Sequence, residues 1–179
     1  MNVNIVKVGE LECNCYLLER DNKILVIDPG DNVDKIINMI GDREVVGVII
    51  THYHFDHIGV LDEIVNRYNV NVYDKSNMNE GEFIIGDFIF NVIYTPGHKE
   101  DCISIYFVDE GMMFVGDFIF RDSIGRVDLP GGNIDDMICS INKIKNYDGD
   151  IVIYPGHGDS TTLGYEIDNN IYFRDINLM

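Results

Sequence analysis

The sequence VGVIITHYHFDHIGVLDEI, residues 46–64, decides the fold. An apolar strand pattern leads directly into HYHFDH, and apolar residues at helical spacing follow it. Alternate residues of an extended segment share a face, so His52 and His54 project to the same side. Asp56 and His57, in the first turn of the following helix, face a second point nearby. These four side chains can all bind metals, and their arrangement at a strand-to-helix junction indicates two metal positions.

The motif THYHFDH resembles the T-H-x-H-x-D-H signature of the metallo-β-lactamase-fold hydrolases. Further motifs of that family follow in the family's order, namely TPGH, FVGD and YPGHG, which carry His98, Asp117 and His157. All five histidines of the chain stand at motif positions. The resemblance covers nearly the whole chain. It implies an α/β fold, the four-layer αβ/βα sandwich of two mixed β-sheets with outer helices, and a metal cleft at one edge.

The composition predicts one domain over residues 1–179, because a chain of this length with 46% hydrophobic residues can bury a full core. No apolar run approaches the roughly 20 residues that span a bilayer, and the start MNVNIVKVGE is unlike a signal peptide. We therefore expect a cytoplasmic protein with no membrane partner. The net charge is −18, from 13 basic and 31 acidic residues, and the scattered basic residues argue against a nucleic-acid partner. The sequence does not indicate an oligomeric state.

Hydrophobic periodicity predicts the order of the elements. Three strands joined by short turns between Val3 and Asp28 indicate an antiparallel meander. The nearly continuous apolar run of 44–52 indicates a strand buried on both faces, which requires helices outside the sheet. Apolar spacing then predicts helices over 31–40, 58–68, 134–144 and 161–167, and further strands over 70–73, 82–86, 87–95, 101–108, 111–117 and 150–158.

The resemblance also implies a set of ligands for two divalent metal ions. One metal would take His52, His54 and His98, the second would take Asp56, His57 and His157, and Asp117 would bridge them. Zn²⁺ is expected first, with Fe²⁺ or Mn²⁺ as alternatives, because imidazole and carboxylate suit these ions. The four cysteines lack CxxC spacing and are expected to be reduced, and no thiolate is expected at the site. Two cations outweigh two carboxylates, so a locally positive cleft is expected.

Such a site is expected to use metal-bound hydroxide, because coordination lowers the pKa of water from 15.7 to about 7. Asp56 is the expected catalytic residue, orienting that hydroxide with its spare oxygen. All five imidazoles are used as ligands, so none remains to protonate a leaving group. A thiol, with a pKa of about 8.5, can leave as the thiolate.

Two further segments narrow the resemblance. SIGRVDLPGGN, residues 123–133, resembles the G-R-x-D-x-P-x-G segment of small glyoxalase II-like hydrolases, and TTLGYE, residues 161–166, resembles their C-terminal element. The resemblance implies hydrolysis of a small-molecule thioester, of the hydroxyacylglutathione type, to a 2-hydroxy acid and a thiol. The C-terminal domain with which longer glyoxalase II enzymes hold glutathione is not expected here. The identity of the thiol in the substrate therefore stays open.

The roles of two polar residues also stay open. Arg126 either binds a substrate carboxylate or pairs with Asp128. Asp28, at the end of a strand, either caps the next segment or hydrogen-bonds to a metal ligand.

Other functions on the same scaffold remain possible. A persulfide dioxygenase would use one Fe²⁺ held by His52, His98 and Asp117. A lactonase, a phosphodiesterase and a non-catalytic metal-binding protein are further alternatives. The PGG sequence at 130–132 favours the hydrolase over the dioxygenase, and an aspartate rather than a cysteine at position 117 disfavours the antibiotic-degrading β-lactamases.

Overall fold

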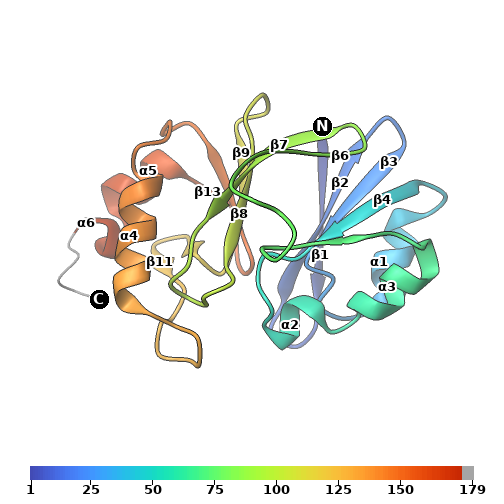
Figure 1. The fold of residues 1–179 in the computed structure, drawn as a ribbon, viewed down its shortest axis with the longest axis horizontal. Helices are drawn as coiled ribbons and strands as arrows, with labels where there is room; N and C mark the ends of the chain where they lie inside the picture. Colours follow the sequence, from blue (N-terminus) through green and yellow to red (C-terminus); the bar gives the residue numbers. More distant parts are fainter. Residues whose placement is uncertain (175–179) are drawn as a thin grey trace.

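Two β-sheets pack face to face in the computed structural model, which describes residues 1–174 (Figure 1). The first sheet has the order β1 (Asn2–Val8), β2 (Cys13–Arg20), β3 (Lys23–Ile27), β4 (Glu44–Ile49) and β5 (Val72–Tyr73). The second has the order β13 (Thr161–Thr162), β12 (Val152–Pro155), β9 (Met112–Gly116), β8 (Ile103–Phe107), β7 (Phe88–Tyr94) and β6 (Gly81–Ile85). A small separate ribbon joins β10 (Ile119–Phe120) and β11 (Ser123–Ile124).

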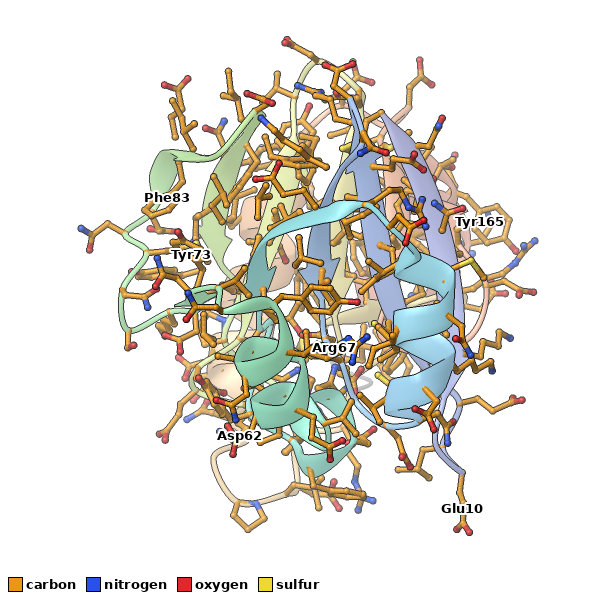
Figure 2. The ribbon with its side chains drawn as sticks, turned by 90° about the vertical axis from the view of Figure 1, so that its right-hand side faces the viewer. Glu10, Asp62, Arg67, Tyr73, Phe83 and Tyr165 are labelled. Carbon is orange, nitrogen blue, oxygen red and sulfur yellow. The ribbon has the colours of Figure 1, made fainter. Side chains whose placement is uncertain are left out.

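Helices cover the outer face of each sheet, which confirms the four-layer αβ/βα sandwich. The helices α1 (Val33–Ile40), α2 (Phe55–Ile58) and α3 (Leu61–Tyr68) lie on the first sheet, and Figure 2 shows α1 and α3 in front of its strands. The helices α4 (Ile134–Ile144), α5 (Leu163–Asn169) and α6 (Ile171–Arg174) lie on the other side of the molecule (Figure 1). None of the helices within residues 1–174 is long and apolar enough to cross a membrane.

Each layer boundary has its own apolar core. Ile36, Ile40 and Ile64 from α1 and α3 pack on the first sheet, and Met137 and Ile141 of α4 pack on the second. This is the helical spacing that the sequence shows for these segments. Between the sheets lies a third core, rich in aromatic residues: Phe88, Phe90, Phe107 and Phe114.

Truncation of Phe114 tests the core between the sheets. Its ring is fully buried, stacks on Tyr154 at 4.8 Å between centroids and meets Phe107 edge-on at 5.9 Å. Phe114→Ala is expected to lower the free energy of unfolding by about 3–5 kcal/mol in urea titrations, because the cavity cannot fully collapse. Val108→Ala, at a side chain that is 51% exposed, is the control and should change it little. A Phe114→Ala protein as stable as this control would contradict the packing described here.

Parallel strand pairs fix where the candidate ligands emerge. β3 pairs with β4, and β9 pairs with β12, both in parallel register. Parallel strands end at the same edge of a sheet, so the segments that follow them start side by side. Asp28 and His52 therefore follow one pair, and Asp117 and His157 follow the other.

One predicted helix differs from the structure. The helix expected over 58–68 is divided into α2 and α3, because the Val60 N–H donates to the Pro29 carbonyl at 3.2 Å instead of continuing a helix. At this point the chain packs closely, since a Cβ on Gly59 would lie 2.2 Å from the Gly30 carbonyl oxygen. The second sheet is mixed, as expected, because β12 pairs with β9 in parallel. The antiparallel meander of β1, β2 and β3 is confirmed.

Candidate metal centre

The histidine-rich motif bends at His54, where the extended backbone after β4 turns into α2. His54 has φ −83° and ψ 148°, and its carbonyl accepts the first bond of the helix from the His57 N–H at 3.0 Å. His52 and His54 therefore leave an extended segment, whereas Asp56 and His57 leave a helical turn. This junction sends the two pairs of side chains toward two neighbouring points, as the motif predicts.

The first of these points gathers His52, His54, His98 and Asp117, whose candidate ligand atoms all lie within 4.8 Å of one another. His54 Nδ1 lies 3.0 Å from His52 Nε2 and 2.8 Å from His98 Nε2. His98 comes from the loop after β7 and Asp117 from the end of β9. Three imidazole nitrogens and one carboxylate thus converge from distant parts of the chain.

The second point gathers Asp56, His57 and His157, together with Cys13, again within 4.8 Å. Asp56 Oδ2 lies 3.1 Å from His157 Nε2 and 3.8 Å from His57 Nε2. The sequence did not indicate that this sulfur lies near the site, although the expectation was only that no thiolate is offered there. Cys13 begins β2 and forms an isolated bridge with His157, a long-range contact that cysteine spacing could not reveal. Burial raises the pKa of its thiol to about 11, which favours the protonated form.

Asp117 lies between the two groups. Its Oδ2 is 3.6 Å from both His98 Nε2 and His157 Nε2, and its Oδ1 is 3.3 Å from His57 Nε2. One carboxylate therefore faces imidazoles of both groups, the position that a bridging ligand requires.

Two polar atoms at this centre are buried without a hydrogen-bond partner among residues 1–174: His57 Nε2 and Asp117 Oδ1. Such orphaned groups are rare in folded proteins and costly unless something binds them. Both atoms belong to residue types that bind Zn²⁺, Fe²⁺ and Mn²⁺, and both face the other candidate ligands. The donor set consequently fits divalent cations.

In four of the candidate ligand histidines, the ring nitrogen that faces away from the cluster, Nδ1, contacts a protein oxygen. His98 Nδ1 contacts the Arg126 carbonyl at 2.7 Å, and His157 Nδ1 contacts the Leu11 carbonyl at 2.9 Å. His52 Nδ1 lies 3.2 Å from Thr51 Oγ1, and His57 Nδ1 lies 2.9 Å from Asp28 Oδ2. These contacts orient each Nε2 toward the cluster, which is the usual arrangement around metal-binding histidines.

Asp28 joins two parts of the site. Its Oδ1 accepts the Thr51 N–H at 2.8 Å, and its Oδ2 accepts the Thr51 hydroxyl at 2.6 Å while also contacting His57. Of the two roles open from the sequence, the structure favours the contact with a candidate ligand. The residue has φ 54°, a conformation that aspartate and asparagine tolerate better than most residues.

Asp28→Asn is expected to weaken zinc binding by about 10–100-fold, because it removes the charge that orients His57. Asparagine keeps the volume and tolerates the same backbone conformation, so folding is expected to persist. Competition with a chromophoric chelator measures the affinity, and Asp34→Asn, at an exposed position of α1, is the control. Equal zinc affinities of the Asp28→Asn and Asp34→Asn proteins would show that Asp28 does not support metal binding.

Protonation in the cluster largely suits metal binding. Burial, then the nearby His57 and His98, hold the pKa of His52 well below its usual value, so its lone pair is available. Burial acts to raise the pKa of Asp117, but the nearby His57 ring, with Nε2 at 3.3 Å from Oδ1, keeps that pKa below the usual value. His57 differs: burial acts to lower its pKa, yet the Asp28 carboxylate raises it well above the usual value. The Asp28 carboxylate thus favours the protonated form of the His57 ring.

Arg126 lies at the mouth of the site with its guanidinium paired. Its Nε and Nη2 donate to the two oxygens of Asp128, both at 2.7 Å. This is the pairing that the sequence left as an alternative to substrate binding. The backbone of Arg126 has a second role, since its carbonyl holds His98.

The sequence profile of the metallo-beta-lactamase superfamily matches residues 8–74 and 79–157 of this chain. The chain belongs to the metallo-beta-lactamase superfamily. The match includes every position at which this metallo-beta-lactamase-fold chain carries a candidate ligand, as the motifs in the sequence implied.

Individual members of the superfamily are similar over nearly the full length. Hydroxyacylglutathione hydrolase GloC of Haemophilus influenzae is 28% identical over 209 aligned residues, which cover 97% of this chain and 99% of that protein. The crystal structure of BLEG-1, a B3 metallo-beta-lactamase, superposes with a TM-score of 0.93 at 29% identity and covers 97% of this chain and 100% of that chain. The crystal structure of TTHA1623 in a di-iron-bound form superposes with a TM-score of 0.87 at 28% identity. The superposition covers 95% of this chain and 100% of that chain.

Proposed function

We propose that this member of the superfamily is a metallohydrolase that cleaves thioesters. The observation that carries the proposal is a cavity of about 890 Å³ beside the candidate metal centre, with Asp56, His98, Asp117 and His157 in its wall. A small substrate in this cavity reaches both groups of candidate ligands. The similarity to GloC, a hydroxyacylglutathione hydrolase, supports a thioester as the substrate.

The proposed ligands are the seven residues predicted from the sequence: His52, His54, Asp56, His57, His98, Asp117 and His157. Bound divalent cations would activate water and polarise the scissile carbonyl. Zn²⁺ is the first choice for both positions, and the di-iron form of TTHA1623 keeps Fe²⁺ as an alternative. The expected single domain and cytoplasmic location stay predictions.

Asp56 is the proposed catalytic residue. Its side chain is half-buried at the cavity wall, and burial acts to raise its pKa while the hydrogen bond with His157 holds that pKa below the usual value. The ionised carboxylate can accept a hydrogen bond from water and orient it toward the substrate carbonyl. All five imidazoles take part in the two groups or face them, so a leaving group must depart without their help. A thiol meets this condition because its anion is stable near neutral pH.

Arg126 is proposed to contact the substrate from the cavity mouth. Its side chain is exposed and lines the cavity, and Nη1 is the part of the guanidinium not engaged by Asp128 in the described structure. A single hydrogen bond from this nitrogen suits a substrate hydroxyl or carboxylate group.

A panel of substrates tests the proposed reaction. Zinc-loaded protein is assayed with a thioester, a lactone, bis-p-nitrophenyl phosphate and a β-lactam, the last because of the likeness to BLEG-1. The thioester is expected to give the highest kcat/KM, and Asp56→Ala is expected to lower it strongly. Faster turnover of any other substrate, or full thioester turnover by Asp56→Ala, would overturn the assignment.

A further inference from the structure

The wall of the cavity beside the metal centre is largely apolar. Away from the candidate ligands it is formed mainly by Leu11, Phe55, Phe120, Ile124, Leu129 and Pro130. Phe120 lies edge-on to His157, with 6.1 Å between ring centroids, so the apolar wall reaches the candidate ligands themselves. A group attached to the reacting carbonyl would therefore contact hydrocarbon on several sides.

Leu11 and Phe55 form a ridge at the mouth of this cavity. Their side chains are 55% and 75% exposed, although both are large apolar residues. Both also line a neighbouring groove of about 390 Å³, so the ridge separates two hollows. Covering two exposed apolar side chains with a ligand is favourable, since their surface leaves water.

Away from the metal positions, the side-chain charges around the ridge oppose an anionic ligand. The main cavity has two cationic side chains in its wall, Lys99 and Arg126, and each is already paired, with Asp101 at 2.8 Å and with Asp128 at 2.7 Å. Besides the candidate ligand Asp56, the neighbouring groove contains the acidic residues Glu10 and Asp31 and no basic side chain in its described lining. Figure 2 shows Glu10 extending outward from the loop between β1 and β2. A net charge of −18 acts in the same direction.

We infer, on the basis of the proposed thioester hydrolysis, that the thiol part of the substrate is apolar and carries no negative charge. Leu11 and Phe55 are then its specificity-determining contacts. In the reaction, water forms the new C–O bond, the C–S bond breaks, and its electron pair leaves on sulfur as the thiolate. The products are a carboxylic acid and a thiol without negatively charged groups, rather than glutathione, which has two carboxylates.

The position of Leu11 connects this preference to the metal centre. Its carbonyl holds His157 Nδ1 at 2.9 Å, while its side chain points to the cavity wall. Substitution of the side chain leaves that carbonyl in place. Leu11→Ala can therefore test substrate preference while keeping the backbone contact that orients His157.

Two thioesters with the same acyl group test the inference. One carries the neutral thiol N-acetylcysteamine and the other carries glutathione, and zinc-loaded protein is expected to give the neutral one a kcat/KM about tenfold higher or more. Leu11→Ala and Phe55→Ala are each expected to reduce this ratio about tenfold, mainly through KM for the neutral thioester. Ile84→Ala, at another exposed apolar residue, is the control and should keep the ratio. Calorimetric binding of the matching uncleavable thioethers should show the same order of affinity.

The outcomes separate the inference from the proposed function. Equal or faster hydrolysis of the glutathione thioester overturns the inference and leaves thioester hydrolysis standing. The same holds if the Leu11 and Phe55 variants weaken both substrates equally. No turnover of either thioester by protein of verified metal content overturns both.

Discussion

Asp117→Ala is expected to remove both cations and to reduce kcat/KM for thioester hydrolysis by about 10³-fold or more. The reason is the position of this carboxylate, with Oδ1 at 3.3 Å from His57 Nε2 and Oδ2 at 3.6 Å from the nearest nitrogens of His98 and His157. Removing it leaves each group with imidazoles and at most one carboxylate, and removes the charge that holds two cations together. Metal content after desalting and the rate of hydrolysis measure the two effects.

A control separates this loss from a general effect of removing an acid. Asp109→Ala removes an exposed carboxylate elsewhere and should keep both metals and the rate. The circular dichroism spectrum of Asp117→Ala should match that of the parent protein, since no core side chain is lost. Two retained metals with unchanged turnover would show that Asp117 does not bridge.

Gly156→Ala is the second substitution with a large expected effect. An added Cβ would lie 2.2 Å from Asp117 Oδ1 and 2.7 Å from His57 Cε1. Both atoms belong to candidate ligands, so moving either one away disturbs the cluster. The affinity for metal is therefore expected to fall by at least about 100-fold, the upper end of the effect of losing a residue that supports a metal ligand. Competition with a chromophoric chelator and metal content after desalting detect the change.

Gly158→Ala is the matched control for this substitution. Gly158 has φ +76°, but a Cβ there would meet nothing within 4 Å. Its alanine variant should lose about 1–2 kcal/mol of stability from backbone strain and should still bind metal. If Gly156→Ala bound metal as tightly as Gly158→Ala, the close packing at Asp117 would be wrong.

Most of the architecture was predictable because apolar spacing and helix-capping residues indicate the same helices and strands. The α4 helix begins and ends where the apolar spacing predicts, and Asn133 caps it by accepting the N–H groups of Asp135 and Asp136. The boundary between α2 and α3 was not predictable, because it depends on the contact of Val60 with Pro29, residues distant in sequence. The strands β10, β11 and β13 contain only two residues each, too few for periodicity to detect.

The candidate site also has features that the sequence predicted and features that it did not. The local motif around His52 predicted two metal positions, and the family motifs placed the distant residues there. The approach of Cys13 to His157 and the support from the Leu11 carbonyl come from tertiary contacts with the start of β2, which no local pattern encodes. The pairing of Arg126 with Asp128 was visible as a possibility two residues apart, and only the geometry could favour it.

Metal content of the purified protein, combined with the reaction that it supports, tests the dinuclear hydrolase most directly. Two divalent metal ions per chain are expected, together with thioester hydrolysis that a chelator abolishes and added metal restores. One iron per chain, with rapid oxygen uptake on glutathione persulfide and no thioester hydrolysis, would contradict it and identify the dioxygenase instead.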